Sequence, residues 1–168
     1  VDSLDQSRFA TLYEYNVDSA KFIASPGAYA ARSAEISNYT MGYSTPIFSP
    51  TGGMKISASD LAKYMMMHMN MGRGNGKKII KKKSARIMQT PLGEKGRYGL
   101  AIVSTDSLVL GESLKGHTGS AYGLYSTMFF NPKKKFGIVA ISNGYSPNGS
   151  AGLRMVVNCL YDDWIRKD

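Results

Sequence analysis

A short segment in the second half of the chain combines a histidine, a hydroxyl and flanking glycines. Gly116, His117, Thr118 and Gly119 are followed directly by Ser120. The histidine can donate a hydrogen bond or present positive charge to a carboxylate, and the threonine adds a hydroxyl donor. The glycines let the backbone approach a ligand, and a neighbouring backbone N–H could stabilise an oxyanion. These residues therefore predict one wall of a substrate-binding site, although a polar strand end with turn glycines explains the tetrapeptide equally well.

The residues around this segment have the alternation of strands rather than the period of helices. Four apolar runs are bounded by turn-forming residues, and they are expected to form two hairpins, across turns at 104–107 and 131–135: Tyr98–Val103 with Leu108–Leu110, and Leu124–Phe130 with Phe136–Ser142. The Gly-His-Thr-Gly segment stands between these runs. It is therefore expected on or beside an edge strand, next to a cleft.

Other parts of the chain have the 3.6-residue period of helices. Ser57 and Asp60 fit a capping box, so a helix is expected from there to Gly72. A second helix is expected around Lys82–Gln89, and a short one between Leu4 and Tyr15. A last helix should be capped by Ser150, because an apolar stripe follows it: Leu153, Val156, Val157, Leu160, Tyr161 and Trp164.

This order of elements predicts an α/β fold of the α+β type. We expect an antiparallel sheet of about 3–5 strands with helices packed on it. The 168 residues are enough for one domain with a core of its own. Within this single segment, residues 1–50 are expected to form an irregular insertion that leans on parts outside the chain, and residues 51–168 to hold the regular elements.

The chain is basic, with a formal net charge of +9. Its lysines gather in three clusters, which could bind a phosphate backbone or an anionic membrane or cell-wall surface: Lys77–Lys78, Lys81–Lys83 and Lys133–Lys135. Nucleic-acid modules usually interleave aromatic residues or arginines with their lysines, and these clusters do not. They are interpreted as a solvated face and a charged turn, and no nucleic-acid partner is expected.

Cysteine and apolar content limit the function further. Cys159 is the single cysteine, so an internal disulfide is excluded, and its apolar surroundings predict a buried side chain. No apolar stretch approaches the roughly 20 residues that a transmembrane helix needs. No transmembrane segment, metal or cofactor is expected.

A methionine-rich run offers a different kind of chemistry. Soft thioethers with a histidine suit Cu(I), and Met65, His68 and Met69 could share one face of a helix. Methionine is also the flexible filler of irregular cores. Core packing is therefore the preferred interpretation, with copper binding as the alternative.

Several motifs together resemble the serine β-lactamase and penicillin-binding protein superfamily, in particular its class C-like D-Ala-D-Ala carboxypeptidases and esterases. The segment 49–62 resembles the Gly-Gly helix start of these proteins, and 98–100 their Tyr-Gly-Leu strand. Further matches follow in the family's order: Gly116–Gly119, Gly123, Ser126, Pro132 and Ile141–Gly144. The resemblance covers roughly residues 50–165 and implies the C-terminal part of the β-lactamase/transpeptidase-like fold.

The resemblance also implies roles for individual residues. His117 and Thr118 would contact the substrate carboxylate and assist proton transfer, Gly116 and Gly119 would line the site, and Ser120 would offer its backbone N–H to the oxyanion hole. The substrate would be a D-Ala-D-Ala peptide, a β-lactam or a small ester, hydrolysed through an acyl-serine intermediate. Histidine in place of the family's more common lysine makes true β-lactamase activity a weaker expectation.

Two catalytic motifs of the superfamily are absent from the sequence. No serine has a lysine three positions later, and no tyrosine has an asparagine two positions later. Without the nucleophile and its base, acyl transfer cannot begin, so the chain is expected to be an inactive C-terminal half of a periplasmic or extracytoplasmic bacterial hydrolase. A non-catalytic module that recognises cell-wall peptide or a partner is the alternative. Exposed apolar surface on such a half predicts a dimer in isolation.

Overall fold

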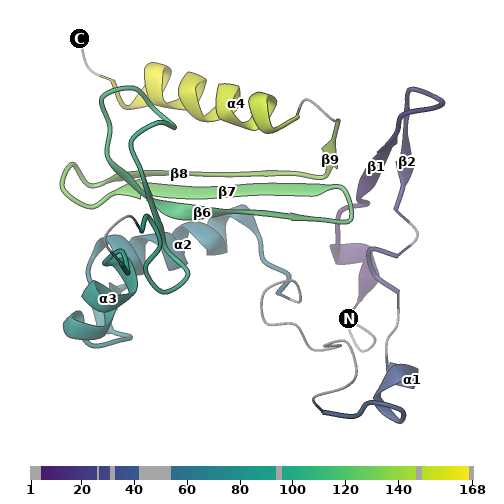
Figure 1. Ribbon diagram of the computed structural model, residues 1–168, viewed down its shortest axis with the longest axis horizontal. Helices are drawn as coiled ribbons and strands as arrows, with labels where there is room; N and C mark the ends of the chain where they lie inside the picture. The colour runs from purple at the N-terminus through teal and green to yellow at the C-terminus, as the bar shows by residue number, and fades with distance from the viewer. Residues whose placement is uncertain are drawn as a thin grey trace.

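The computed structural model describes residues 5–25, 27–30, 33–41, 54–93, 96–146 and 149–166. Its centre is a four-stranded antiparallel sheet with the strand order β5-β6-β7-β8 (Figure 1). These strands are Val103–Thr105, Leu114–Ala121, Leu124–Asn131 and Phe136–Ser142. An antiparallel sheet with helices packed on it is the predicted α+β architecture, which is thereby confirmed.

Helices cover both faces of this sheet. The helices α2 (Ala58–Met69) and α3 (Lys82–Gln89) lie on one side and α4 (Gly149–Trp164) on the other (Figure 1). Side chains alternate between the two faces along each strand, so the sheet supports two separate cores. The α2 core contains Met65, Met69, Ile102, Met128 and Phe130. The α4 core contains Val109, Leu114, Phe129, Ile138, Val157 and Tyr161.

The helix α2 begins where the capping box predicts. Ser57 Oγ accepts a hydrogen bond from the backbone N–H of Asp60 at 3.1 Å, and donates to the Asp60 carboxylate at 2.9 Å. At the other end, Gly72 takes a φ of +92°, and its N–H bonds to the carbonyl of Met67 at 2.9 Å. A glycine tolerates this left-handed turn without strain. The short hairpin of β3 (Arg73–Gly74) and β4 (Lys77–Lys78) then leads to α3.

The N-terminal region differs from the sequence-based expectation. In place of the helix expected over 4–15, the structure has a single 3-10 turn, η1 (Gln6–Arg8), and a strand, β1 (Tyr13–Asn16). The strand β1 pairs with β2 (Lys21–Ala24) and, in parallel, with β9 (Gly144–Tyr145). The backbone bonds of β1 thus depend on a partner about 130 residues later, which no local periodicity reveals. The remaining element of this region is the one-turn helix α1 (Ser33–Ile36).

Two further expectations were wrong in detail. The hairpin of Tyr98–Val103 with Leu108–Leu110 does not form, because β5 includes the first two residues of the expected turn and pairs with β6 instead. Val109 is completely buried in the α4 core, so this stretch serves as a core-filling loop rather than a strand. Cys159 is exposed on α4 rather than buried. The other expected hairpin, β7 with β8, and the last helix are confirmed, but α4 begins at Gly149, so Ser150 lies inside the helix instead of capping it.

Candidate functional site on strand β6

The Gly-His-Thr-Gly segment lies in β6, and half of this strand has a free edge. The strand β5 pairs only with Leu114–Gly116, whereas β7 pairs with Lys115–Ala121. Within the part of the chain that the structure describes, residues 117–121 therefore have a strand neighbour on one side only. In an antiparallel strand, the backbone N–H and C=O groups alternate in direction, so some of these groups point outward from the sheet. The predicted position beside an edge is confirmed.

His117 and Thr118 project toward different faces of the sheet. His117 is directly opposite Met128, which belongs to the α2 core, and Thr118 is opposite Thr127. Residues directly opposite each other share a face, so His117 lies on the α2 side and Thr118 on the α4 side. Both side chains border the same free edge. An extended ligand lying along this edge could therefore meet both residues and the outward backbone groups.

A tyrosine from outside the motif contacts the histidine. The Tyr98 hydroxyl lies 2.9 Å from His117 Nε2, and the two rings meet edge to face at a centroid distance of 5.5 Å. His117 Nδ1 contacts the carbonyl oxygen of Thr118. A carbonyl can only accept, so in the neutral imidazole the proton is on Nδ1, and Nε2 accepts from Tyr98. Tyr98 thus fixes the tautomer and direction of the ring. Sequence reasoning used Tyr98 only as part of a strand match and missed this contact.

A lysine occupies the same face two residues before the histidine. Lys115 Nζ donates to the carbonyl of Gln89, at the end of α3, and to Ser104 Oγ at 3.3 Å. Burial lowers the pKa of the Lys115 ammonium. These bonds tie α3 to β5 and β6. Lys115 therefore supports the strand from which His117 projects.

The two glycines of the motif are in different surroundings. A Cβ added to Gly116 would lie 1.8 Å from the carbonyl oxygen of Met128, so this buried position requires glycine for close strand packing. A Cβ at Gly119 would meet only Ser126 Oγ, at 2.8 Å, and this is a flexible side chain. The requirement at Gly116 is structural. The contacts with substrate expected of Gly116, Gly119 and Ser120 stay predictions.

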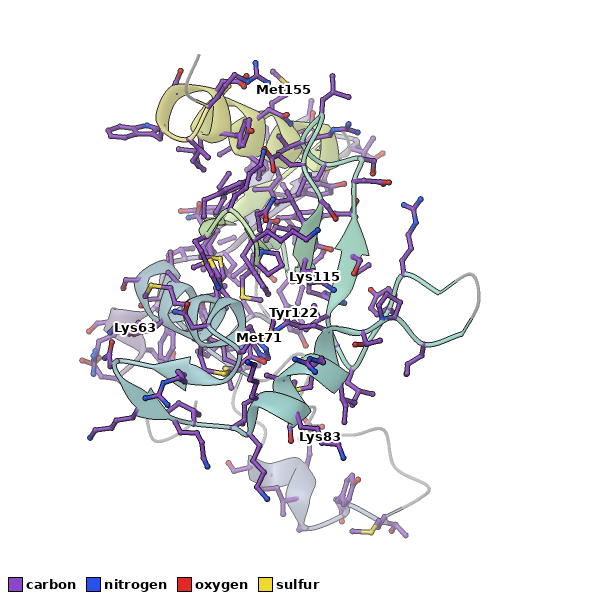
Figure 2. The ribbon with its side chains drawn as sticks, turned by 90° about the vertical axis from the view of Figure 1, so that its left-hand side faces the viewer. Lys63, Met71, Lys83, Lys115, Tyr122 and Met155 are labelled. Atoms are coloured by element: carbon purple, nitrogen blue, oxygen red, sulfur yellow. The ribbon has the colours of Figure 1, made fainter. Side chains whose placement is uncertain are left out.

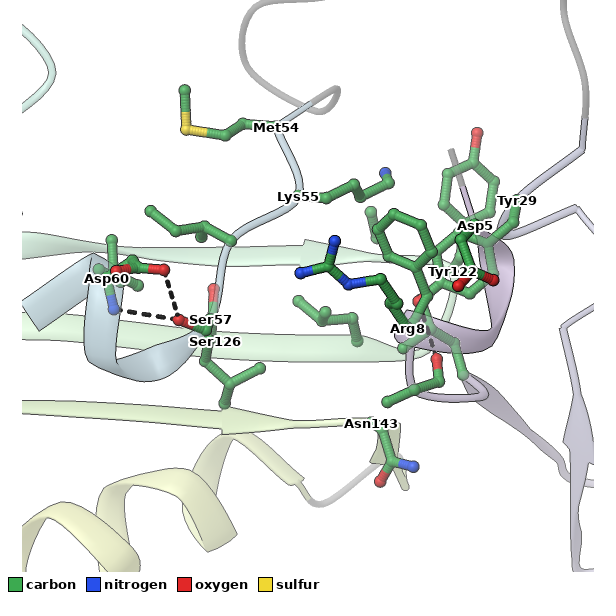
Figure 3. A pocket seen from close by; sticks show the side chains of 18 residues that line it. Asp5, Arg8, Tyr29, Met54, Lys55, Ser57, Asp60, Tyr122, Ser126 and Asn143 are labelled. Carbon is green, nitrogen blue, oxygen red and sulfur yellow. Dashed lines mark hydrogen bonds between the residues drawn. The ribbon is translucent and has the colours of Figure 1, made fainter. Parts of the chain in front are cut away.

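A cavity of about 750 Å³ lies beyond the end of the motif (Figure 3). Its lining includes Ala121 at the end of β6 and Tyr122 from the turn that follows, and Leu124, Ser126 and Ile141 from β7 and β8. The other walls include η1 and the start of α2 with the segment that precedes it, and they contribute two cations, Arg8 and Lys55, and two carboxylates, Asp5 and Asp60. Residues 116–120 do not line this cavity. The expected cleft therefore begins at Ala121, one residue after the predicted site.

The methionine-rich helix belongs to the core. Met65 and Met69 pack against Met128 and Phe130, as the core-packing interpretation predicts. His68 is completely buried, and neither of its ring nitrogens has a hydrogen-bond partner. Its ring meets Tyr64 edge to face at 4.6 Å, and burial lowers its pKa. Among the described residues, no three His, Cys, Asp or Glu side chains gather as a metal site would require.

No helix in the described ranges is long and apolar enough to cross a membrane.

Comparison with known proteins identifies the family to which the chain belongs. No curated protein matches the sequence. A family model described as Beta-lactamase matches residues 1–156, a range that includes the helix start before α2, the Tyr-Gly-Leu segment and the Gly-His-Thr-Gly strand. The chain therefore belongs to the Beta-lactamase family, within the serine β-lactamase and penicillin-binding hydrolase superfamily.

Proposed function

We propose that this chain supplies the substrate-side strand of a serine hydrolase site for D-Ala-D-Ala peptides, β-lactams or small esters. The observation that carries the proposal is the free edge of β6, which presents His117 and Thr118 beside outward backbone groups. A peptide carboxylate at this edge would accept a hydrogen bond from the Thr118 hydroxyl, and one from Nε2 of His117 in the doubly protonated form of the ring. We place the protein in the periplasm or another extracytoplasmic compartment of a bacterium, as the family resemblance implies.

The proposed roles follow from the position of each group. Tyr98 orients the His117 ring, and the Thr118 hydroxyl binds the carboxylate together with the ring when Nε2 is also protonated. A backbone N–H at Ser120 would be one donor of the oxyanion hole. The arrangement stabilises charge on the substrate, but it includes no activated nucleophile.

The printed sequence holds no Ser-x-x-Lys and no Tyr-x-Asn. We therefore propose that these 168 residues bind substrate without forming an acyl intermediate. In a polypeptide that joins a Ser-x-x-Lys segment to them, we expect serine acylation followed by hydrolysis.

Binding and turnover can be tested separately. Titration of the chain with an acyl-D-Ala-D-Ala peptide, followed by NMR, should show millimolar binding that His117→Ala and Thr118→Val each weaken. Lys133→Ala removes a cation at the β7–β8 turn and should leave binding unchanged. The chain alone should not hydrolyse nitrocefin. Absence of binding at millimolar peptide would contradict the proposed substrate edge, and hydrolysis by the chain alone would contradict the proposed lack of a nucleophile.

The same assay distinguishes the alternative of a non-catalytic recognition module. A polypeptide that includes Ser-x-x-Lys should form a covalent adduct with penicillin or with a fluorophosphonate. Peptide binding without any such adduct would favour recognition of cell-wall peptide over hydrolysis.

A further inference from the structure

One part of the chain carries only positive charge. Between Asp60 and Glu94 there is no acidic residue, and eight lysines and arginines stand in that interval. Seven of them fall within residues 73–86, which form β3, β4 and the start of α3. Because these elements are consecutive in the chain, their charges share one region of the molecule.

All seven side chains of this region are exposed. We call them the basic surface: Arg73, Lys77, Lys78, Lys81, Lys82, Lys83 and Arg86. The surface lies on the α2 and α3 side of the sheet, and Lys83 is on the opposite side of the molecule from Met155 of α4 (Figure 2).

Among the described residues, no ion pair neutralises the charge of the basic surface. The ion pairs formed among the described residues are Lys63–Asp60, Lys134–Glu112 and Arg166–Asp162, all outside this surface. The first turn of α3 holds no acidic residue, and Lys81 before it makes no capping bond with its side chain. Lysines at the positive end of a helix dipole destabilise the helix. An external anionic surface would offset this repulsion.

Large aliphatic side chains are exposed among these cations. Ile79 is 60% exposed, Ile87 46% and Leu92 57%. Ile79 lies between β4 and α3, and Ile87 stands one helical turn after Lys83, on the outward side of α3. Aliphatic side chains are not stabilised by contact with the solvated phosphate backbone of a nucleic acid. They are stabilised on entering the boundary between lipid headgroups and acyl chains. The combination favours a lipid bilayer over nucleic acid.

We propose that the basic surface binds the face of a bilayer that contains anionic phospholipids, with Ile79 and Ile87 inserted at the headgroup level. The lysines and arginines approach lipid phosphates, and the protein lies on the membrane without crossing it. Binding of this kind orients the molecule, with α3 toward the lipid and α4 away from it. The proposal is independent of the proposed hydrolase function.

Co-sedimentation with lipid vesicles tests this surface. The full chain should bind vesicles of phosphatidylcholine with 30% phosphatidylglycerol much more tightly than pure phosphatidylcholine, and added salt should weaken that binding. Removing two charges with Lys82→Gln/Lys83→Gln should weaken partitioning by about tenfold or more. Ile79→Gln, which changes no charge, should also weaken it.

A matched variant controls for net charge. Lys21→Gln/Lys133→Gln removes two exposed lysines outside the basic surface and should bind nearly as the unaltered chain does. Thermal unfolding of each variant checks that the fold is intact. Equal binding to both kinds of vesicle, or equal loss in both double variants, would overturn the proposal. So would binding to a DNA duplex with no binding to anionic vesicles, since it would assign the surface to nucleic acid.

Discussion

Tyr98 and His117 are 19 residues apart in sequence, yet the tyrosine hydroxyl lies 2.9 Å from Nε2 of the histidine. With Nδ1 held at the Thr118 carbonyl, both nitrogens of the neutral ring are assigned: Nδ1 donates and Nε2 accepts. The histidine is thus presented to the free edge of β6 in one tautomer. A ligand carboxylate near Nε2 would have to compete with Tyr98 or be bound together with its hydroxyl.

Removal of the Tyr98 hydroxyl should weaken the preference of the His117 ring for this tautomer. In Tyr98→Phe we expect the population with the proton on Nδ1 to fall, which the nitrogen-15 shifts of the imidazole report directly. The chain has two histidines, so a His68→Gln background leaves only the His117 signals. Tyr122→Phe changes another exposed tyrosine as a control. Identical shifts in Tyr98→Phe and in the unaltered chain would show that the hydroxyl does not fix the ring.

The buried histidine should make stability depend on pH. Burial lowers the pKa of His68 below its ordinary value of 6.5, so the unfolded chain binds a proton that the folded chain does not. The free energy of unfolding should therefore fall as the pH drops below about 6.5. In His68→Leu this component should vanish, because the ring has no hydrogen bond to lose.

Urea unfolding at pH 7.5 and pH 5.0 measures this component of stability. His117→Gln, at a half-buried position, serves as the control and should keep the dependence. An equal loss of stability in His68→Leu and in the unaltered chain would contradict the assignment.

A buried carboxylate connects the α4 core to the β7–β8 turn. Glu112 accepts hydrogen bonds from Asn131 at 2.8 Å, and from Lys134 and Tyr161, each at 2.5 Å. Burial alone would raise the pKa of Glu112, but these three bonds outweigh it, and the pKa is lowered. The stability that the carboxylate contributes is therefore present above its unfolded pKa, and it is lost as the pH falls through the folded value.

Glu112→Gln should lower the free energy of unfolding at pH 7 by about 1–3 kcal/mol, with a smaller difference near pH 3. Asp162→Asn breaks the exposed pair with Arg166 and should cost less than about 1 kcal/mol. Urea unfolding of both variants at the two pH values gives the comparison. Equal costs would show that the Glu112 bonds are no stronger than a surface ion pair.

Gly123, the second central residue of the turn between β6 and β7, should tolerate no side chain. Tyr122 and Gly123 have φ values of 51° and 81°, as in the type I′ turns of tight hairpins. A Cβ at Gly123 would lie 2.0 Å from the Tyr13 carbonyl oxygen. Gly111 has nearly the same φ, 79°, with open space around it.

We expect Gly111→Ala to cost about 1 kcal/mol from backbone strain. Gly123→Ala should cost clearly more, because β1 must also move away from the turn. Thermal unfolding gives both costs, and proteolysis of the β1–β2 hairpin reports the loss of that contact. Equal destabilisation would mean that the contact with β1 contributes nothing.

Exposed apolar residues on α4 should promote self-association. Trp164 is 82% exposed and Met155 66%, although the same helix buries Val157. We expect a dimer or larger species by light scattering, with a blue shift of the single tryptophan's emission as concentration rises. Trp164→Lys should increase the monomer fraction, and Lys21→Gln should not. A monomer at every concentration would contradict this expectation.

Sequence patterns located the elements whose signals are local. The capping box at Ser57 and Asp60 and the alternation of 124–130 and 136–142 each depend on neighbouring residues, and α2, β7 and β8 follow them. The motif was likewise placed on its strand. All four residues of β2 are exposed, so this strand lacks the alternation of buried and exposed residues by which a sequence pattern indicates a strand. The strand β5 was misplaced because its partner is β6, which comes later in the chain.

The candidate site, like the fold, could be predicted only in part from the sequence. The sequence indicated His117 and Thr118, but it could not show that their side chains project to opposite faces, since this depends on the register with Met128 and Thr127. Nor could it show the contact with Tyr98, which arises where the chain bends back at the isolated bridge between Tyr98 and Val103. Both depend on pairing across the sheet rather than on spacing along the chain.

The parallel pairing of β1 with β9 has a consequence for the order in which the protein can assemble. Tyr13 donates to the carbonyl of Asn143 at 2.8 Å, and Asn143 Nδ2 donates to the carbonyl of Thr11 at the same distance. A ribosome that adds about 5–20 residues per second makes β1 roughly 7–26 seconds before β9. The β1–β2 hairpin is therefore synthesised well before its partner strand β9, and the pairing of β1 with β9 can form only once β9 has been made.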